Sequence, residues 1–129
     1  MSRDPQRLDD YLGHILEAIE RIRHYTDDMD ESDFHSNLLI QDAVIRNLEV
    51  VGEASHNIEK SFPEFAAGRP ELPFVFAYEM RNALAHGYFK IDAKIVWRTI
   101  RKDLPAFGAQ IRAVLDAQNG TGGTNPAEN

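Results

Sequence analysis

The sequence predicts an all-α protein, an antiparallel bundle of four to five helices, on three observations. Apolar residues recur every three or four positions through several long segments, which is the period of an amphipathic helix. No segment alternates polar and apolar residues convincingly, and turn dipeptides of the hairpin kind occur only near the C-terminus. The 129 residues, 43% of them hydrophobic, suffice for one domain with a core and are too few for two.

The first two expected helices cover residues 4–27 and 33–61. Each carries one apolar stripe, made in the first by Leu8, Leu12, Ile15, Ile19 and Ile22 and in the second by Val44, Leu48, Val51 and Ile58. An acidic run at 27–33 separates the two, and Pro63 lies just beyond the second. Glycine and prolines at 68–73 then indicate a loop.

The remaining helices are expected at residues 73–86 and from Asp92, a plausible N-cap, to 117. Gly87 is typical of the residue that ends a helix. Pro105 lies inside the last apolar stripe, which predicts a kink or break near Asp103. The helical domain is thus expected to occupy residues 1–117, and the tail at 118–129, rich in Gly, Thr and Asn, to be disordered.

Composition excludes several classes of protein. The chain has no cysteine, which rules out disulfides and thiolate metal sites and fits a reducing cytoplasm. It has no run of 18 apolar residues and no basic-then-apolar start, so we expect a cytoplasmic protein without a membrane segment or secretory signal. No glycine-rich phosphate loop, Ser-His-Asp set or zinc pattern is present, and we expect neither a metal site nor a cofactor.

Charge is unevenly distributed along the chain, whose net charge is −7. Between Arg81 and Lys102, six basic residues stand against Asp92 alone, so this segment carries +5 and the rest of the chain −12. Residues 27–33 instead hold five acids in seven positions. A phosphate ligand would be attracted to the first segment and repelled by the second. The alternative is that both are solvated surface.

The chemically richest segment is the octet Arg81-Asn82-Ala83-Leu84-Ala85-His86-Gly87-Tyr88. Asn82 and His86 are four residues apart on one helix face, so the Asn82 amide could hydrogen-bond and orient the imidazole. Arg81 and His86 are about 140° apart on an ideal helix. One ligand atom could contact both only if the helix end distorts at Gly87 or a second chain contributes.

These groups suit cleavage of RNA without a metal. The Arg81 guanidinium offers donors for phosphate oxygens, and His86 can remove or return a proton near neutral pH. Together they fit attack of a ribose 2′-hydroxyl on its own phosphodiester, with Arg81 stabilising the charge that develops. The alternative is that His86 only caps the helix C-terminus, an effect of about 0.3–1 kcal/mol when it is charged.

The octet and its flanks resemble the HEPN superfamily, and within it the HepT-like toxins of prokaryotic toxin–antitoxin pairs. Arg81, Asn82, His86 and Tyr88 match the family signature position for position. The similarity extends to residues 41–54, to Ile95-Val96-Trp97 and to Lys102-Asp103-Leu104-Pro105, and it covers roughly residues 5–116. Three positions depart from the family: Phe74 stands where relatives often carry Trp, and Tyr78-Glu79 where they often carry a small residue and Gly.

This resemblance implies a homodimer in which two copies of the motif form one cleft, and a metal-independent endoribonuclease that acts on RNA. Arg81 and His86 would be essential and Asn82 would support them. The partner would be an MntA-like minimal nucleotidyltransferase antitoxin, which transfers AMP onto Tyr88 and so silences the toxin. The alternative is a non-catalytic subunit that binds nucleotides or the nucleotidyltransferase.

Two further sets of charged residues have open interpretations. Lys90, Lys94, Arg98 and Arg101 could follow an RNA backbone along the last helix, or they could form an exposed face without a ligand. Arg46, Glu49 and Glu53 share a face of the second helix, where they fit intrahelical salt bridges or dimer contacts better than catalysis. Pairing of Arg46 with the motif across the bundle is a further possibility.

Overall fold

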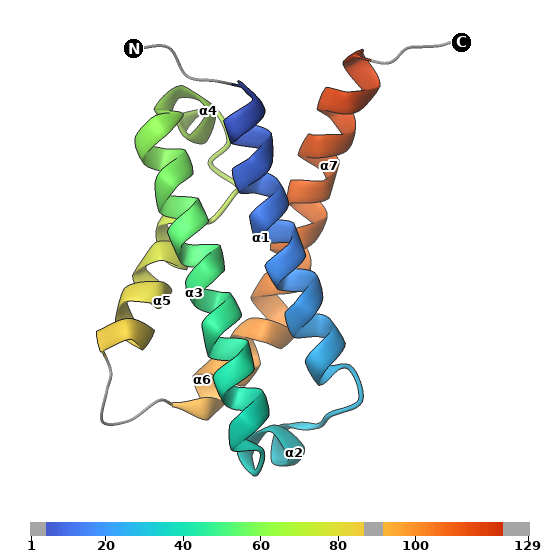
Figure 1. The fold of residues 1–129 in the computed structure, drawn as a ribbon, viewed down its shortest axis with the longest axis vertical. Coiled ribbons are helices and arrows are strands. Elements are labelled where there is room, and N and C mark those ends of the chain that lie inside the picture. Colours follow the sequence, from blue (N-terminus) through green and yellow to red (C-terminus); the bar gives the residue numbers. More distant parts are fainter. Residues whose placement is uncertain (1–4, 87–91, 123–129) are drawn as a thin grey trace.

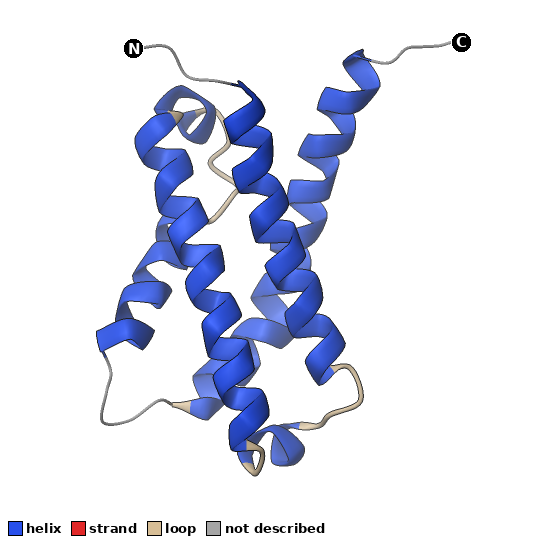
Figure 2. Ribbon diagram, viewed as in Figure 1, coloured by secondary structure: helices blue, strands red, loops and turns tan. Residues whose placement is uncertain are grey.

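The computed structural model describes residues 5–86 and 92–122, and this part of the chain is helical and contains no strand (Figure 2). The helices are α1 Pro5–Thr26, α2 Glu31–His35, α3 Leu38–Ser61, α4 Pro63–Ala67, α5 Phe74–His86, α6 Ala93–Arg98, the π-helix η1 Thr99–Asp103 and α7 Leu104–Gly122. The predicted all-α class is confirmed. Among the described helices, none combines the length and the apolar character that crossing a membrane requires.

The long helices run in alternating directions, as an antiparallel bundle requires (Figure 1). α1 packs against α3 and α7, and α5 packs on α3 at one side of the bundle. The most deeply buried large side chains include Leu12, Ile15, Phe34, Val44, Ile58, Phe74 and Ile111. The apolar stripes predicted from the helical period therefore form one core.

The second expected helix is divided into α2 and α3, because side-chain caps start a helix twice. Asp30 accepts a hydrogen bond from the backbone N–H of Asp33, and the Asp33 carboxylate accepts one from the N–H of Asp30. Asn37 then caps α3 by accepting from the N–H of Ile40. Part of the acidic run thus serves as local caps, and its charged side chains are exposed.

The distortion predicted near Pro105 is a π-helical segment and not a break. The N–H of Leu104 donates to the carbonyl of Thr99, five residues earlier, within a helical path that continues from α6 into α7. Pro105 has no N–H to donate to the carbonyl of Arg101, so a regular α-helical pattern cannot pass this point. The end of α7 at Gly122 lies beyond the expected helix end at residue 117.

Arg101, in the π-helical segment, ties the α1–α2 connection to α6 and η1. Its Nη2 donates to the carbonyls of Thr26, at 2.7 Å, and Met29, at 2.6 Å. Its guanidinium lies 4.3 Å from the ring centroid of Trp97, whose ring in turn contacts Phe34. These contacts give Arg101 a structural role.

The crossing of α3 and α5 depends on Gly52. A Cβ at this position would collide with the Arg81 side chain and would lie 2.7 Å from the carbonyl oxygen of Ala77. One turn along, the His56 and Tyr78 rings stack with centroids 4.0 Å apart and an angle of 12°. The bulky Tyr78 therefore adds a contact between these two helices.

We expect Gly52→Ala to lower the free energy of unfolding by about 1–3 kcal/mol, because the added methyl group overpacks a contact with backbone. Urea denaturation followed by circular dichroism measures this change. Gly13→Ala is the matched control: nothing lies within 4 Å of its Cβ, so replacing a helical glycine should stabilise the protein by about 0.5–1 kcal/mol. Equal effects of the two substitutions would contradict the close crossing.

Arg101→Ala should also destabilise the protein, by about 1–3 kcal/mol, since two carbonyls lose a charged donor. Lys102→Ala, the exposed neighbour, should change stability by less than about 0.5 kcal/mol. Thermal unfolding of the two variants compares them directly. A stable Arg101→Ala variant would show that the contacts with Thr26 and Met29 contribute little.

Candidate functional site

The predicted motif lies on the last two turns of α5. Arg81 and Asn82 are half-buried, whereas His86, the final residue of the helix, is exposed. α5 packs mainly on α3, so α3 supplies the residues that surround the motif. Gly87, Tyr88 and Lys90 lie outside the described residues.

The Arg81 guanidinium is fixed by two oxygen atoms from different helices. Nη1 donates to Oδ1 of Asn82 at 2.9 Å, and Nη2 lies 3.5 Å from Oε1 of Glu53 on α3. The side chains of Arg81 and Glu53 are 33% and 53% exposed, so this ion pair contributes less than about 1 kcal/mol to stability. Its main effect is to set the orientation of the guanidinium plane.

The Asn82 side chain binds Arg81, whereas the sequence predicted that it would bind the imidazole of His86. Its side-chain oxygen accepts from Arg81, because the neighbouring charged guanidinium is a stronger donor than the ring. His86 instead contacts the backbone of Asn82, with its Nδ1 2.9 Å from the carbonyl oxygen. The expected bond from the Asn82 amide to His86 is therefore replaced by a bond to the Asn82 main chain.

This contact determines which nitrogen of neutral His86 carries the proton. A carbonyl oxygen can only accept, so Nδ1–H must donate to it. Nε2 then keeps its lone pair on an exposed ring and can accept a proton. The same bond is a C-terminal capping contact, so one interaction both supports the helix end and fixes the tautomer.

A surface hollow of about 270 Å³ lies beside Arg81, between α3 and α5. It is lined by Arg46, Glu49, Val50, Glu53, Arg81 and Ala85. Asn82 and His86 are not among the lining residues, which agrees with the wide angle expected between Arg81 and His86. Within one copy of the chain, the hollow beside Arg81 is thus lined without the imidazole of His86.

Intrahelical salt bridges, one of the two interpretations of Arg46, Glu49 and Glu53, are not formed in α3. Within the part of the chain that the structure describes, Glu53 pairs across the helix crossing with Arg81, and Arg46 and Glu49 have no ion pair. Sequence spacing did not identify Glu53 as the partner of Arg81. Gly52 could have indicated this pair, because a residue without a side chain lets α5 approach α3 next to position 53.

Of the basic residues after the motif that the structure describes, Arg101 differs from Lys94 and Arg98 in its contacts. Lys94 and Arg98 are exposed on α6, whereas the guanidinium of Arg101 is held by Thr26 and Met29. The π-helical segment changes the helical register between Arg98 and Arg101. None of these three residues lines the hollow beside Arg81.

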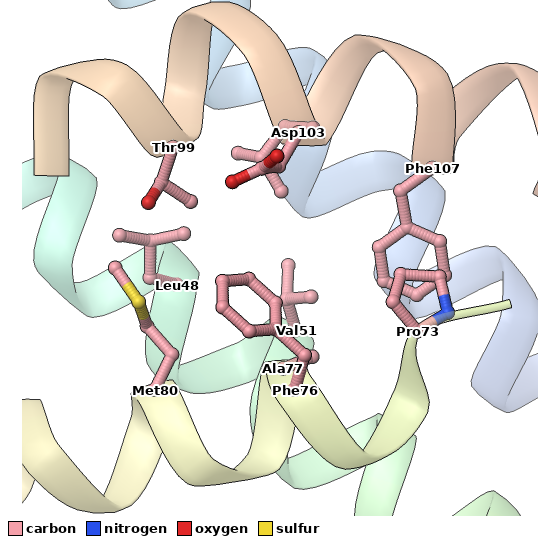
Figure 3. Close-up of a pocket in the computed structure, with 10 residues that line it drawn as sticks. Leu48, Val51, Pro73, Phe76, Ala77, Met80, Thr99, Asp103 and Phe107 are labelled. Carbon is pink, nitrogen blue, oxygen red and sulfur yellow. The ribbon is translucent and has the colours of Figure 1, made fainter. Parts of the chain in front are cut away.

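A second hollow lies between α5 and η1 and is apolar. Figure 3 shows Phe76 and Met80 of α5 facing Thr99 and Asp103 across it. Its volume of about 20 Å³ holds roughly one water molecule, too little for a nucleotide. In residues 5–86 and 92–122, no group of three or more His, Asp or Glu side chains could hold a metal ion.

Known proteins resemble this chain over most of its length. It is 40% identical over 106 residues to a Methanocaldococcus jannaschii protein named "Gamma-glutamylcyclotransferase and putative RNase", covering 82% of this chain and 46% of that protein. A Thermococcus cleftensis protein named "Probable ribonuclease HepT" is 41% identical over 97 residues, 75% of this chain and 86% of the relative.

The match to the Methanocaldococcus protein spans less than half of that relative's own length. No solved structure matches the chain. The family model described as "Ribonuclease HepT-like" matches residues 15–114, which include all of α3, α5 and α6 and therefore Glu53, Arg81 and His86. By this match and by its identity to the Thermococcus relative, the chain belongs to the HepT-like ribonuclease family.

Proposed function

We propose that this protein is a metal-independent endoribonuclease and the toxin of a toxin–antitoxin pair. The observation that carries the proposal is the fixed guanidinium of Arg81 beside an open hollow, on the same helix end as the free Nε2 of His86. Family membership and the ribonuclease names of the relatives support RNA as the substrate.

In the proposed reaction, Nε2 of His86 takes the proton of a ribose 2′-hydroxyl. The 2′-oxygen then forms a bond to the neighbouring phosphorus, and the bond from phosphorus to the 5′-oxygen breaks. The leaving 5′-oxygen takes a proton from a protonated His86 imidazole. Arg81 stabilises the negative charge that grows on the phosphate oxygens, and the products are a 2′,3′-cyclic phosphate and a 5′-hydroxyl.

The absence of His86 from the hollow beside Arg81, together with the wide angle between the two positions on a helix, favours a site built from two copies. A two-fold dimer would place the His86 of one copy opposite the Arg81 of the other, so that one phosphate contacts both. Lys94 and Arg98 would extend the basic surface along the RNA, and Lys90 would add to it. Arg101 would support this surface indirectly, by holding the α1–α2 connection.

Tyr88 is the proposed acceptor of AMP from an MntA-like nucleotidyltransferase antitoxin. The residue is second after His86 in the sequence, so a nucleotide attached to it would add negative charge and bulk next to the imidazole. Added phosphate would repel the RNA phosphate and thereby silence the toxin.

We expect purified, unmodified protein to cleave RNA in EDTA and to leave cyclic-phosphate ends, resolved by gel electrophoresis and mass spectrometry. Arg81→Ala and His86→Ala should each lower the rate by about 10²–10⁴-fold. Arg81→Lys should also lose most activity, because an ammonium group cannot replace the planar fork that binds Asn82 and Glu53 together.

Arg21→Ala and His24→Ala are the matched controls, since both residues are exposed on α1 and belong to neither the motif nor the hollow. They should cleave like the wild type. If wild type and motif variants are equally inert on total cellular RNA, the enzyme proposal fails and a nucleotide- or partner-binding subunit explains the fold better.

Co-expression with an MntA-like nucleotidyltransferase should add one or more AMP units, measured by intact mass, and should abolish cleavage. Tyr88→Phe should keep the unmodified mass, because it lacks the acceptor hydroxyl. Tyr78→Phe, on the preceding part of α5, is the control and should be modified like the wild type. AMP found on Tyr88→Phe would exclude Tyr88 as the sole acceptor.

A further inference from the structure

Two charged side chains in the hollow beside Arg81 have no partner in the described part of the chain. Arg46 and Glu49, three residues apart on α3, face the same hollow and make neither a hydrogen bond nor an ion pair there. Their spacing would allow an intrahelical pair. The guanidinium of Arg46 and the half-buried carboxylate of Glu49 thus lie unpaired next to Arg81, the proposed catalytic arginine.

The hollow has the size and lining of a subsite for a single base. Its volume of about 270 Å³ is near the lower end for small-molecule sites, which suits one nucleobase better than a longer stretch of RNA. Val50 and Ala85 offer apolar contact for a ring, while Arg46 and Glu49 offer donors and acceptors for its edges. Glu53 is already occupied by Arg81.

We propose that this hollow binds a guanine base adjacent to the scissile phosphate and makes the enzyme prefer that base. The Glu49 carboxylate accepts from the N1–H and the N2 amino group of guanine, and the Arg46 guanidinium donates to O6 and N7. The proposal rests on the proposed ribonuclease function, since it assigns a base preference to the same site.

Guanine fits this pair of side chains better than the other three bases. It alone presents two adjacent donors on one edge and two adjacent acceptors on another. In adenine and cytosine the amino group lies beside a ring-nitrogen acceptor, which would face a carboxylate oxygen. In uracil the N3–H lies between two carbonyl oxygens, so a carboxylate there would also oppose an acceptor.

The test uses unmodified full-length protein in EDTA and a set of short RNAs that are uridine-rich except for one variable position. That position carries guanosine, adenosine, cytidine, inosine or 7-deazaguanosine. Inosine lacks the N2 amino group and probes Glu49, while 7-deazaguanosine lacks N7 and probes Arg46. We expect cleavage next to guanosine, with kcat/KM lowered roughly 10- to 100-fold for adenosine and cytidine and about tenfold for either analogue.

Glu49→Gln should remove the difference between guanosine and inosine, and Arg46→Ala the difference between guanosine and 7-deazaguanosine. Glu59→Gln is the matched control, because Glu59 is half-buried on α3 and does not line the hollow. It should keep the full preference. Equal cleavage of all five RNAs by the wild type, or an unchanged preference in Glu49→Gln, would overturn the subsite.

A binding measurement separates this proposal from the ribonuclease proposal. Fluorescence anisotropy with the His86→Ala variant should rank the affinities for the five RNAs in the order expected for cleavage, with guanosine first. This ranking should hold even if the wild type cleaves none of them. No base preference in binding refutes the guanine subsite whatever the cleavage result. A Glu49→Gln variant whose oligomeric state changes while its base preference does not would assign Glu49 to an interface and would also refute it.

Discussion

The close crossing of α3 and α5 at Gly52 is the constraint on which the candidate site depends. Because Gly52 has no side chain, the backbone of α5 approaches α3 at Ala77 and Arg81. This approach brings Glu53 within 3.5 Å of the Arg81 guanidinium, and the stacked rings of His56 and Tyr78 hold the same crossing one turn further along. The orientation of Arg81 is therefore a property of the crossing and not of α5 alone.

The interactions at the candidate site are polar and contribute little to the stability of the fold. The Arg81–Glu53 pair is too exposed to stabilise the fold appreciably, and the hydrogen bond of His86 to the carbonyl of Asn82 is local to the helix end. Both interactions orient side chains. The pair with Glu53 orients the guanidinium of Arg81, and the bond to the Asn82 carbonyl leaves Nε2 of His86 free. Neither interaction uses the buried apolar side chains of the core, to which α5 contributes Phe74 and Ala77.

Local signals explain where the sequence prediction of helices succeeded and where it did not. The amphipathic period identified the long helices, and the Asp92 cap and the Pro105 distortion lie where they were expected. The division of α2 from α3 was missed, because the cap that starts α3 is the single residue Asn37, inside a segment that was read as one continuous helix. Residues 118–122 of the expected tail belong to α7, whereas the dimer and the remainder of the tail stay predictions.

The sequence by itself determined the helical class, the apolar faces and the chemical groups of the motif, since a helical period and a helix end are properties of neighbouring residues. Only the tertiary structure decided which groups meet. Glu53 pairs with Arg81, Arg101 holds a distant connection, and Arg46 and Glu49 remain uncommitted in a hollow. These outcomes depend on the distance and angle at which helices cross, which side-chain volumes at the crossing set and sequence spacing does not.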